Sequence, residues 1–478
     1  MSRKQMLTKK VAHTLLAMSI VSASGLNLWA GTAWAADDGT NGADNTRENV
    51  SISDSADISV VGGNGTDGAA GSGTDDAGGN GGKGGSAALS GTLTVNDSSK
   101  AVSVTVKGGN GGNGGDQSAQ TNAITGNGGS GGEAELQLTV GSDVQTGALT
   151  LKAEAGNGGK SGSDTADSAP TSDVTVGNGG AGGNAAAGIA ITDGSLTATS
   201  ISLTAKAGRA GYLGYINKEG KDNHGSDGGT AGTASIKGLV LSGQQAAVKV
   251  ANDIVITATG GKGGCGGSAY GSAGLAAVGG AAKAYGLVAA DNGDYSVKCA
   301  DLTLTATGGK GGAGGEAGSY YGAINNSSGD PYQSTDGAEG GSAVGKGLAV
   351  QTGTLQLEAN KISVTAAAGA GGGGAIGNAA FGQNTGKDAS DASASASGGI
   401  AQALGIELIQ GELSGKVTSD ITAVANGGVG AYGGDNYFSV TIDGFGTNGS
   451  EDGSSNGGSL AKYWRFIRTA RRKNWKNT

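Results

Sequence analysis

The sequence predicts an all-β fold: a parallel β-solenoid of about eight coils, with glycine-rich, polyglycine-II-like arms projecting from one flank. Two observations predict it. A short strand of alternating apolar residues runs into a glycine tract eight times, at steps of 46 to 61 residues, and such a period is typical of repeat architectures. Aromatic residues make up only 4% of the 478 residues, whereas 102 are glycine. Aliphatic side chains and backbone must therefore form the core.

The eight expected strands each read apolar–x–apolar, so stacking them places like residues on like. The first apolar positions form one expected inward column: Ile58, Val102, Leu149, Ile201, Ile254, Leu302, Ile362 and Ile421. The residues two further along form a second: Val60, Val104, Leu151, Leu203, Ile256, Leu304, Val364 and Ala423. Between them an outward row carries mainly hydroxyls: Ser59, Ser103, Thr150, Ser202, Val255, Thr303, Ser363 and Thr422. A lone coil cannot bury the apolar columns, but neighbouring coils can.

The chain is expected to divide into four segments. Residues 1–35 are predicted to be a signal peptide, with a basic start, an apolar stretch and the small–x–small site Ala33-Trp34-Ala35. Residues 36–57 are an acidic lead-in, residues 58–445 the repeat region, and residues 446–478 a Gly/Ser linker followed by a basic aromatic tail. The signal peptide predicts an exported protein; a membrane anchor is the alternative interpretation of this segment.

The glycine tracts carry a side chain at every third residue, as in Gly81-Gly82-Lys83-Gly84-Gly85. A left-handed extended helix with about three residues per turn places these side chains on one edge and bare glycines on the others. Bare edges let such helices approach closely and form Cα–H···O contacts. An ordered bundle is favoured over the alternative of a flexible linker.

The composition disfavours an enzyme. After the leader the chain holds a single histidine, His224, and between Arg47 and Arg465 the only arginine is Arg209. Adjacent acids such as Asp75-Asp76 are interpreted as solvated turns, and no catalytic residue, metal site or cofactor is expected. Removal of the leader changes the net charge from −9 to −13, which predicts that nucleic acid is not a partner.

The candidate ligand contacts are tyrosines in or beside the glycine tracts, because a flat ring with a polar tip suits contact with sugars or proteins. They are Tyr212, Tyr215, Tyr270, Tyr320, Tyr321, Tyr332, Tyr432 and Tyr437. The alternative is that the rings pack across the tracts and fill the space that glycine leaves.

The two cysteines, Cys265 and Cys299, are 34 residues apart within one unit. They are a candidate disulfide in an exported protein. The alternative is two unpaired thiols.

The basic tail departs from the repeat composition. Its candidate membrane contacts are Trp464, Arg465, Phe466, Arg468, Arg471, Arg472 and Trp475, which would suit an amphipathic helix at an anionic membrane surface. The alternative is a truncation or frame change, because residues 437–442 read as the start of a ninth coil that then stops.

The leader followed by strand ladders and glycine-rich inserts, over about residues 36–445, resembles the passenger domains of autotransporters and the filamentous-haemagglutinin-like adhesins of diderm bacteria. The resemblance rests on architecture and composition. It implies an adhesin at the cell surface or outer membrane, or secreted from the cell, without enzymatic activity. It also implies binding to host or bacterial surface glycans or proteins.

Two other functions stay open. The outward hydroxyl row, extended by Thr105, Thr204, Thr257, Thr305 and Thr365, would suit an ice-binding protein. A β-helix polysaccharide-active enzyme is the other alternative, although it would need clustered carboxylates with a basic partner.

Overall fold

The computed structural model describes residues 36–71, 77–118, 124–165, 174–213, 225–267, 274–313, 337–372, 397–429 and 437–442. All described residues belong to one compact unit, Trp34–Thr478. Every regular element in those residues is a β-strand, so the predicted all-β class is confirmed. No helix in this described part is long and apolar enough to span a bilayer.

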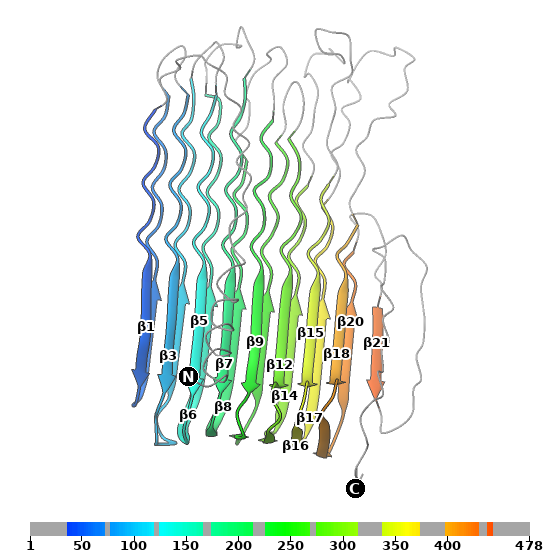
Figure 1. Ribbon diagram of the computed structural model, residues 1–478. Coiled ribbons are helices and arrows are strands. Elements are labelled where there is room, and N and C mark those ends of the chain that lie inside the picture. The colour runs from blue at the N-terminus through cyan, green and yellow to red at the C-terminus, as the bar shows by residue number, and fades with distance from the viewer. Residues whose placement is uncertain are drawn as a thin grey trace, which may run out of the picture. The chain divides into compact units, whose positions relative to one another are not determined.

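The strands form two large sheets (Figure 1). The first has eight parallel strands: β1 (Asn45–Ile52), β3 (Ala87–Leu93), β5 (Ala134–Val140), β7 (Ala185–Ile191), β9 (Ala234–Leu241), β12 (Ala282–Ala289), β15 (Ala343–Val350) and β18 (Ala401–Leu408). The second has 13 strands in two branches. One branch comprises β2 (Ala56–Val61), β4 (Val102–Lys107), β6 (Val144–Glu154), β8 (Gly194–Lys206), β11 (Ile254–Thr259), β14 (Asp301–Thr307), β17 (Lys361–Ala367), β20 (Ile421–Asn426) and β21 (Tyr437–Ile442). The other comprises β10 (Gln245–Val250), β13 (Asp294–Lys298), β16 (Thr354–Ala359) and β19 (Glu412–Val417).

The predicted solenoid of about eight coils, with arms on one flank, is wrong. The chain forms two large sheets of unequal size, and the second branches at β8, which pairs with β6, β10 and β11. The glycine tracts continue the strands end-on: β4 ends at Lys107, and the next tract begins at Gly108. The reason is geometric, since a strand and a polyglycine helix advance by nearly the same length per residue, about 3.3 and 3.1 Å. Each repeat therefore joins one sheet to the other through two glycine tracts.

The predicted inward columns are correct from the second unit onward. Val102 pairs with Leu149, and the register continues unbroken to Ile421. The middle of the second column is fully buried, at 0% exposure for Leu151, Leu203, Ile256, Leu304 and Val364. Each such side chain contributes about 1.5–3 kcal/mol by leaving water, so these columns anchor the second sheet against the first.

The first unit departs from the predicted register by two residues. Ala56, and not Ile58, pairs with Val102, while Ile58 pairs with Val104. The glycine tract sets this register, because the Gly62 N–H donates to the Lys107 carbonyl. Consequently Asp57, and not Ser59, lies beside Ser103 in the outward row.

The two ends of the repeat region also differ from expectation. The segment predicted as an acidic lead-in contains β1, which is an edge strand of the eight-stranded sheet. At the other end, residues 437–442 do not begin a ninth parallel unit. They form β21, which pairs antiparallel with β20.

The glycine tracts run side by side beyond the ends of the strands (Figure 1). Hydrogen bonds join them into a lattice with a period of three residues. The Gly111 N–H donates to the Asn157 carbonyl of the neighbouring tract at 2.9 Å, and the Gly112 N–H donates to the Gly82 carbonyl of a returning tract at 2.8 Å. The third residue, Asn113, points its side chain outward and is half-buried. A Cβ on Gly112 would lie 1.9 Å from the Thr66 carbonyl oxygen, so only glycine fits this crossing.

The candidate disulfide is absent, because Cys265 and Cys299 are both free thiols. Cys265 lies 11 residues beyond Ile254, whereas Cys299 precedes Leu302 by three residues, and Ile254 and Leu302 are register partners. Along the strand direction the two thiols therefore lie roughly 40 Å apart. A disulfide tolerates a Cα separation of only about 7 Å.

Candidate binding surfaces

Every third residue of a glycine tract faces outward, and equivalent residues of neighbouring tracts lie side by side. Asparagine and aspartate side chains hold these rows together. The Asn64 Oδ1 accepts the Asn110 N–H at 2.8 Å, the Asn110 Oδ1 accepts the Asn157 N–H at 2.9 Å, and the Asn157 Oδ1 accepts the Arg209 N–H at 3.1 Å. On the returning tracts a second ladder runs through Asp38, Asn80, Asn127, Asn178, Asp227 and Leu275. These hydrogen bonds thus hold the backbone beneath each outward side chain at a fixed position relative to the next unit.

The first ladder continues as a row of three cations, Arg209, Lys262 and Lys310, which we name the basic row. Their backbones are directly bonded neighbours. The Ala210 N–H donates to the Lys262 carbonyl, and the Gly263 N–H donates to the Lys310 carbonyl, each at 2.9 Å. All three side chains are exposed, and none of them takes part in the ion pairs of the described residues.

Two further lysines flank the basic row. Lys206 lies three residues before Arg209 at the end of β8 and is exposed. Lys160 lies on the adjacent tract beside Tyr212, where the Ser161 N–H donates to the Tyr212 carbonyl at 3.1 Å. The neighbouring Glu154 is engaged by Lys152 at 2.7 Å. The surface around the basic row therefore carries an excess of positive charge on a chain whose net charge is −9.

Tyr212 is the one predicted ligand-contact residue whose side chain the structure describes. It is 50% exposed, and Arg209 packs against it: the guanidinium carbon lies 4.9 Å from the ring centre, and Nη1 donates to the hydroxyl oxygen at 2.8 Å. This contact holds the Arg209 side chain over a flat aromatic face.

For the other predicted contact residues the structure describes no side chain. Tyr437 lies in β21, of which only the strand is described. The remaining candidates lie outside the described residues: Tyr215, Tyr270, Tyr320, Tyr321, Tyr332, Tyr432, and the tail residues Trp464, Arg465, Phe466, Arg468, Arg471, Arg472 and Trp475.

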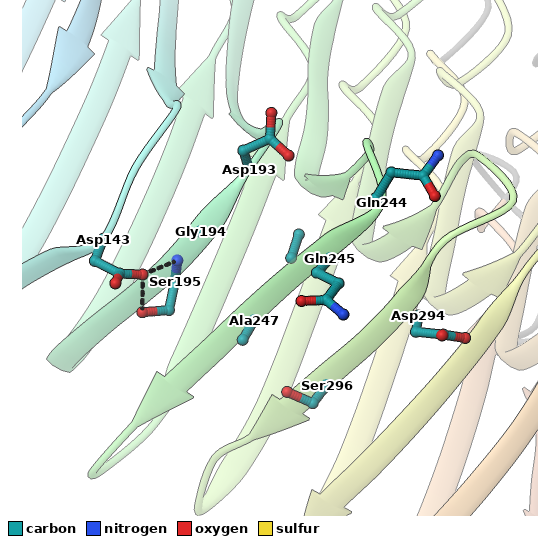
Figure 2. A pocket seen from close by; sticks show the side chains of 10 residues that line it. Asp143, Asp193, Gly194, Ser195, Gln244, Gln245, Ala247, Asp294 and Ser296 are labelled. Atoms are coloured by element: carbon teal, nitrogen blue, oxygen red, sulfur yellow. Dashed lines mark hydrogen bonds between the residues drawn. The ribbon is translucent and has the colours of Figure 1, made fainter.

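A second surface feature is an open depression of about 540 Å³ at the starts of β8, β10 and β13 (Figure 2). Its rim carries three exposed carboxylates, from Asp143, Asp193 and Asp294. The Asp143 Oδ1 accepts both the Ser195 N–H and the Ser195 hydroxyl at 2.9 Å. These side chains line parallel neighbouring strands and offer hydrogen-bonding groups to a polar ligand, but they do not converge on one point in Figure 2.

The outer face of the second sheet carries aligned hydroxyls. Thr204, Thr257, Thr305 and Thr365 are consecutive register partners. The row does not extend to Thr105, because Lys152 lies between Thr105 and Thr204 in the register. Ser202, Val255, Thr303 and Ser363 form the parallel row two residues earlier.

Sequence reasoning missed two features of the structure. Lys262 and Lys310 each occupy the centre of a Gly-Gly-Lys-Gly-Gly run, which aligns them with Arg209 once the tracts are counted from the strand ends. Tyr295 is also buried, at 2% exposure, with its hydroxyl donating to the Gly243 and Asp291 carbonyls. Burial raises the pKa of this phenol, so a ring contributes to a core expected to be aliphatic.

No family model matches the chain, and no curated protein or solved structure is significantly similar to it. Within the described ranges, no three His, Cys, Asp or Glu side chains are grouped so that they could hold a metal ion.

Proposed function

We propose that this chain is a non-enzymatic, exported, adhesin-like structural protein, located at the cell surface or secreted. It binds surface glycans or proteins of a host or of bacteria through its extended repeat surface. One observation supports the proposal above the others: exposed side chains lie in rows whose backbones are bonded from one unit to the next.

Such a surface suits the binding of extended or repeating ligands. Association loses affinity when loops and side chains must be ordered on binding. Here the backbone beneath the outward residues is already ordered by hydrogen bonds in two directions. A ligand that spans several units therefore meets contacts with a constant spacing and a small ordering penalty.

A binding survey with the purified full chain tests the proposal. We expect saturable binding to at least one member of a panel of immobilised glycans, matrix proteins and intact bacterial or host cells. Antibody labelling of intact producing cells, with a cytoplasmic protein as control, should detect the chain at the surface or in the medium. Retention inside the cell, or an absence of binding throughout the panel, would contradict the proposal.

The threonine row favours ice binding as a second candidate function. Thr204, Thr257, Thr305 and Thr365 form a regular hydroxyl row on one sheet face, which offers a repeating array of methyl and hydroxyl groups. Thermal hysteresis of the full chain measures this directly. If the chain binds ice, it should show thermal hysteresis, and Thr257→Lys should reduce that hysteresis. An absence of hysteresis would contradict the ice-binding function.

A further inference from the structure

We propose that the basic row of Arg209, Lys262 and Lys310 binds an acidic polysaccharide, one that carries a carboxylate or sulfate on successive sugars. The inference deepens the proposed function, on which it rests, by naming the ligand class. The polysaccharide lies along the direction in which the units stack, across three neighbouring glycine tracts, with Lys160 and Lys206 beside it.

The spacing of the charges supports an extended ligand. Arg209, Lys262 and Lys310 occupy equivalent positions on bonded neighbouring tracts. Hydrogen-bonded neighbouring chains lie about 4.8 Å apart, so the three cations form a line with one charge per tract. A sugar ring in an extended polysaccharide has a similar length, so successive acidic groups can each meet one cation.

The charges of the basic row are available to a ligand. The described ion pairs involve other residues, and Glu154, which lies beside Lys206 in the adjoining strand, is bonded to Lys152. Both lysines of the row are exposed and project from glycines on either side. Within the described ranges no ion pair engages Lys262 or Lys310, so an anion that binds them breaks no described ion pair.

Tyr212 adds a contact that a simple ion-exchange surface lacks. Its half-exposed ring lies beside Arg209 and Lys160, at the edge of the basic row. A tyrosine face packs against the apolar face of a sugar while its hydroxyl remains in water. The combination of flat ring and spaced cations favours an acidic sugar polymer over a free anion.

Double-stranded DNA is a poorer match than a polysaccharide. A duplex carries one negative charge per about 1.7 Å of its axis, which is denser than one cation per tract. The chain also has a net charge of −9, so a long, densely charged polyanion meets repulsion outside the row. DNA and anionic lipid vesicles therefore serve as comparison ligands.

The test measures binding of the full chain to chondroitin sulfate, polygalacturonate, neutral dextran, duplex DNA and phosphatidylserine vesicles at low and high salt. The test variant combines Arg209→Gln, Lys262→Gln and Lys310→Gln. The matched control removes three exposed lysines elsewhere, with Lys83→Gln, Lys237→Gln and Lys283→Gln. Both variants change the net charge equally, and circular dichroism and melting temperature establish that both fold.

The proposal predicts salt-sensitive binding to chondroitin sulfate or polygalacturonate, with no binding to dextran. The test variant should bind about tenfold more weakly, whereas the control should stay within about twofold of the original chain. Tyr212→Ala should weaken polysaccharide binding while leaving its salt dependence unchanged. Equal losses in both variants, or tighter binding to DNA or vesicles, would overturn the inference.

The outcome also separates this inference from the proposed function. Binding to neutral glycans, proteins or cells without binding to acidic polysaccharides removes the basic row as a site and leaves the adhesin-like function standing. An absence of binding to every ligand removes both.

Discussion

The Asn110 Oδ1 accepts a hydrogen bond of 2.9 Å from the backbone N–H of Asn157, its counterpart one unit later. The two residues are 47 positions apart in the chain. This N–H points outward from the lattice, where no backbone carbonyl accepts it in this row. The asparagine side chain therefore supplies the missing acceptor and links consecutive outward residues into a row.

Removal of this acceptor should destabilise the chain. Asn110→Ala leaves the Asn157 N–H to water, so we expect a loss of about 0.5–1.5 kcal/mol in the free energy of unfolding. Asn110→Asp keeps an acceptor oxygen and should stay close to the original, because Asp67 already plays this part for Asn113 at 2.7 Å. Urea denaturation measures both changes. Equal stability of the alanine and aspartate variants would contradict the assigned hydrogen bond.

Substitutions in the glycine tracts should depend on position within the three-residue period. A Cβ on Gly129 would lie 2.0 Å from the Gly82 carbonyl oxygen, so Gly129→Ala must displace backbone and should cost about 1–3 kcal/mol or more. Its neighbour Ser130 already carries an outward side chain, and Ser130→Ala should be nearly neutral. The melting temperatures of the two variants make the comparison, and equal shifts would rule out the lattice at this point.

The two thiols should differ in reactivity. Burial raises the pKa of Cys299 to about 12, with smaller contributions from Asp301 and Asp253, so its thiolate is scarce at neutral pH. Cys265 is half-buried and should react first with a thiol reagent, while Cys299 should react only on unfolding. Cys265→Ser should abolish the fast phase, and Cys299→Ser should preserve it. A chain without free thiols would contradict the structure.

The pair Lys298–Glu358, at 2.8 Å, should make stability depend on pH. The hydrogen bond from Lys298 lowers the pKa of Glu358 below its ordinary value of 4.5. A carboxyl whose pKa is lower in the folded state stabilises above its unfolded pKa, and this contribution is lost as the pH falls through the folded value. Glu358→Gln should therefore flatten the acid limb of the stability curve below about pH 4.5. A curve unchanged by the substitution would show that the pair contributes nothing.

Much of the second sheet can be predicted from the sequence, because strand alternation is a local signal. Leu151, Leu203 and Ile256 lie in one buried column, as their spacing from the following glycines indicates. The assembly of the strands into two separate sheets cannot be predicted in the same way. It depends on the glycine tracts continuing straight from the strands, which nothing in the alternation specifies.

The candidate site was harder to predict for a related reason. Arg209, Lys262 and Lys310 are 53 and 48 residues apart, so their alignment is hidden until the tracts are counted in threes from the last strand residue. The branch at β8 likewise creates the depression around Asp143, Asp193 and Asp294. That branch arises where a long strand is replaced by two short ones, as β8 gives way to β10 and β11.

The central claim is that the glycine tracts form an ordered lattice that presents outward rows, and amide hydrogen exchange of the full chain tests it most directly. Gly109 and Gly112 donate to carbonyls of returning tracts at 2.8 Å, so their amides should exchange slowly, at rates comparable to those in strand β4. The same slow exchange should recur at Gly156 and Gly159 one unit later. Exchange of all these glycine amides at the rate of an unstructured chain would contradict the lattice and the binding surface built on it.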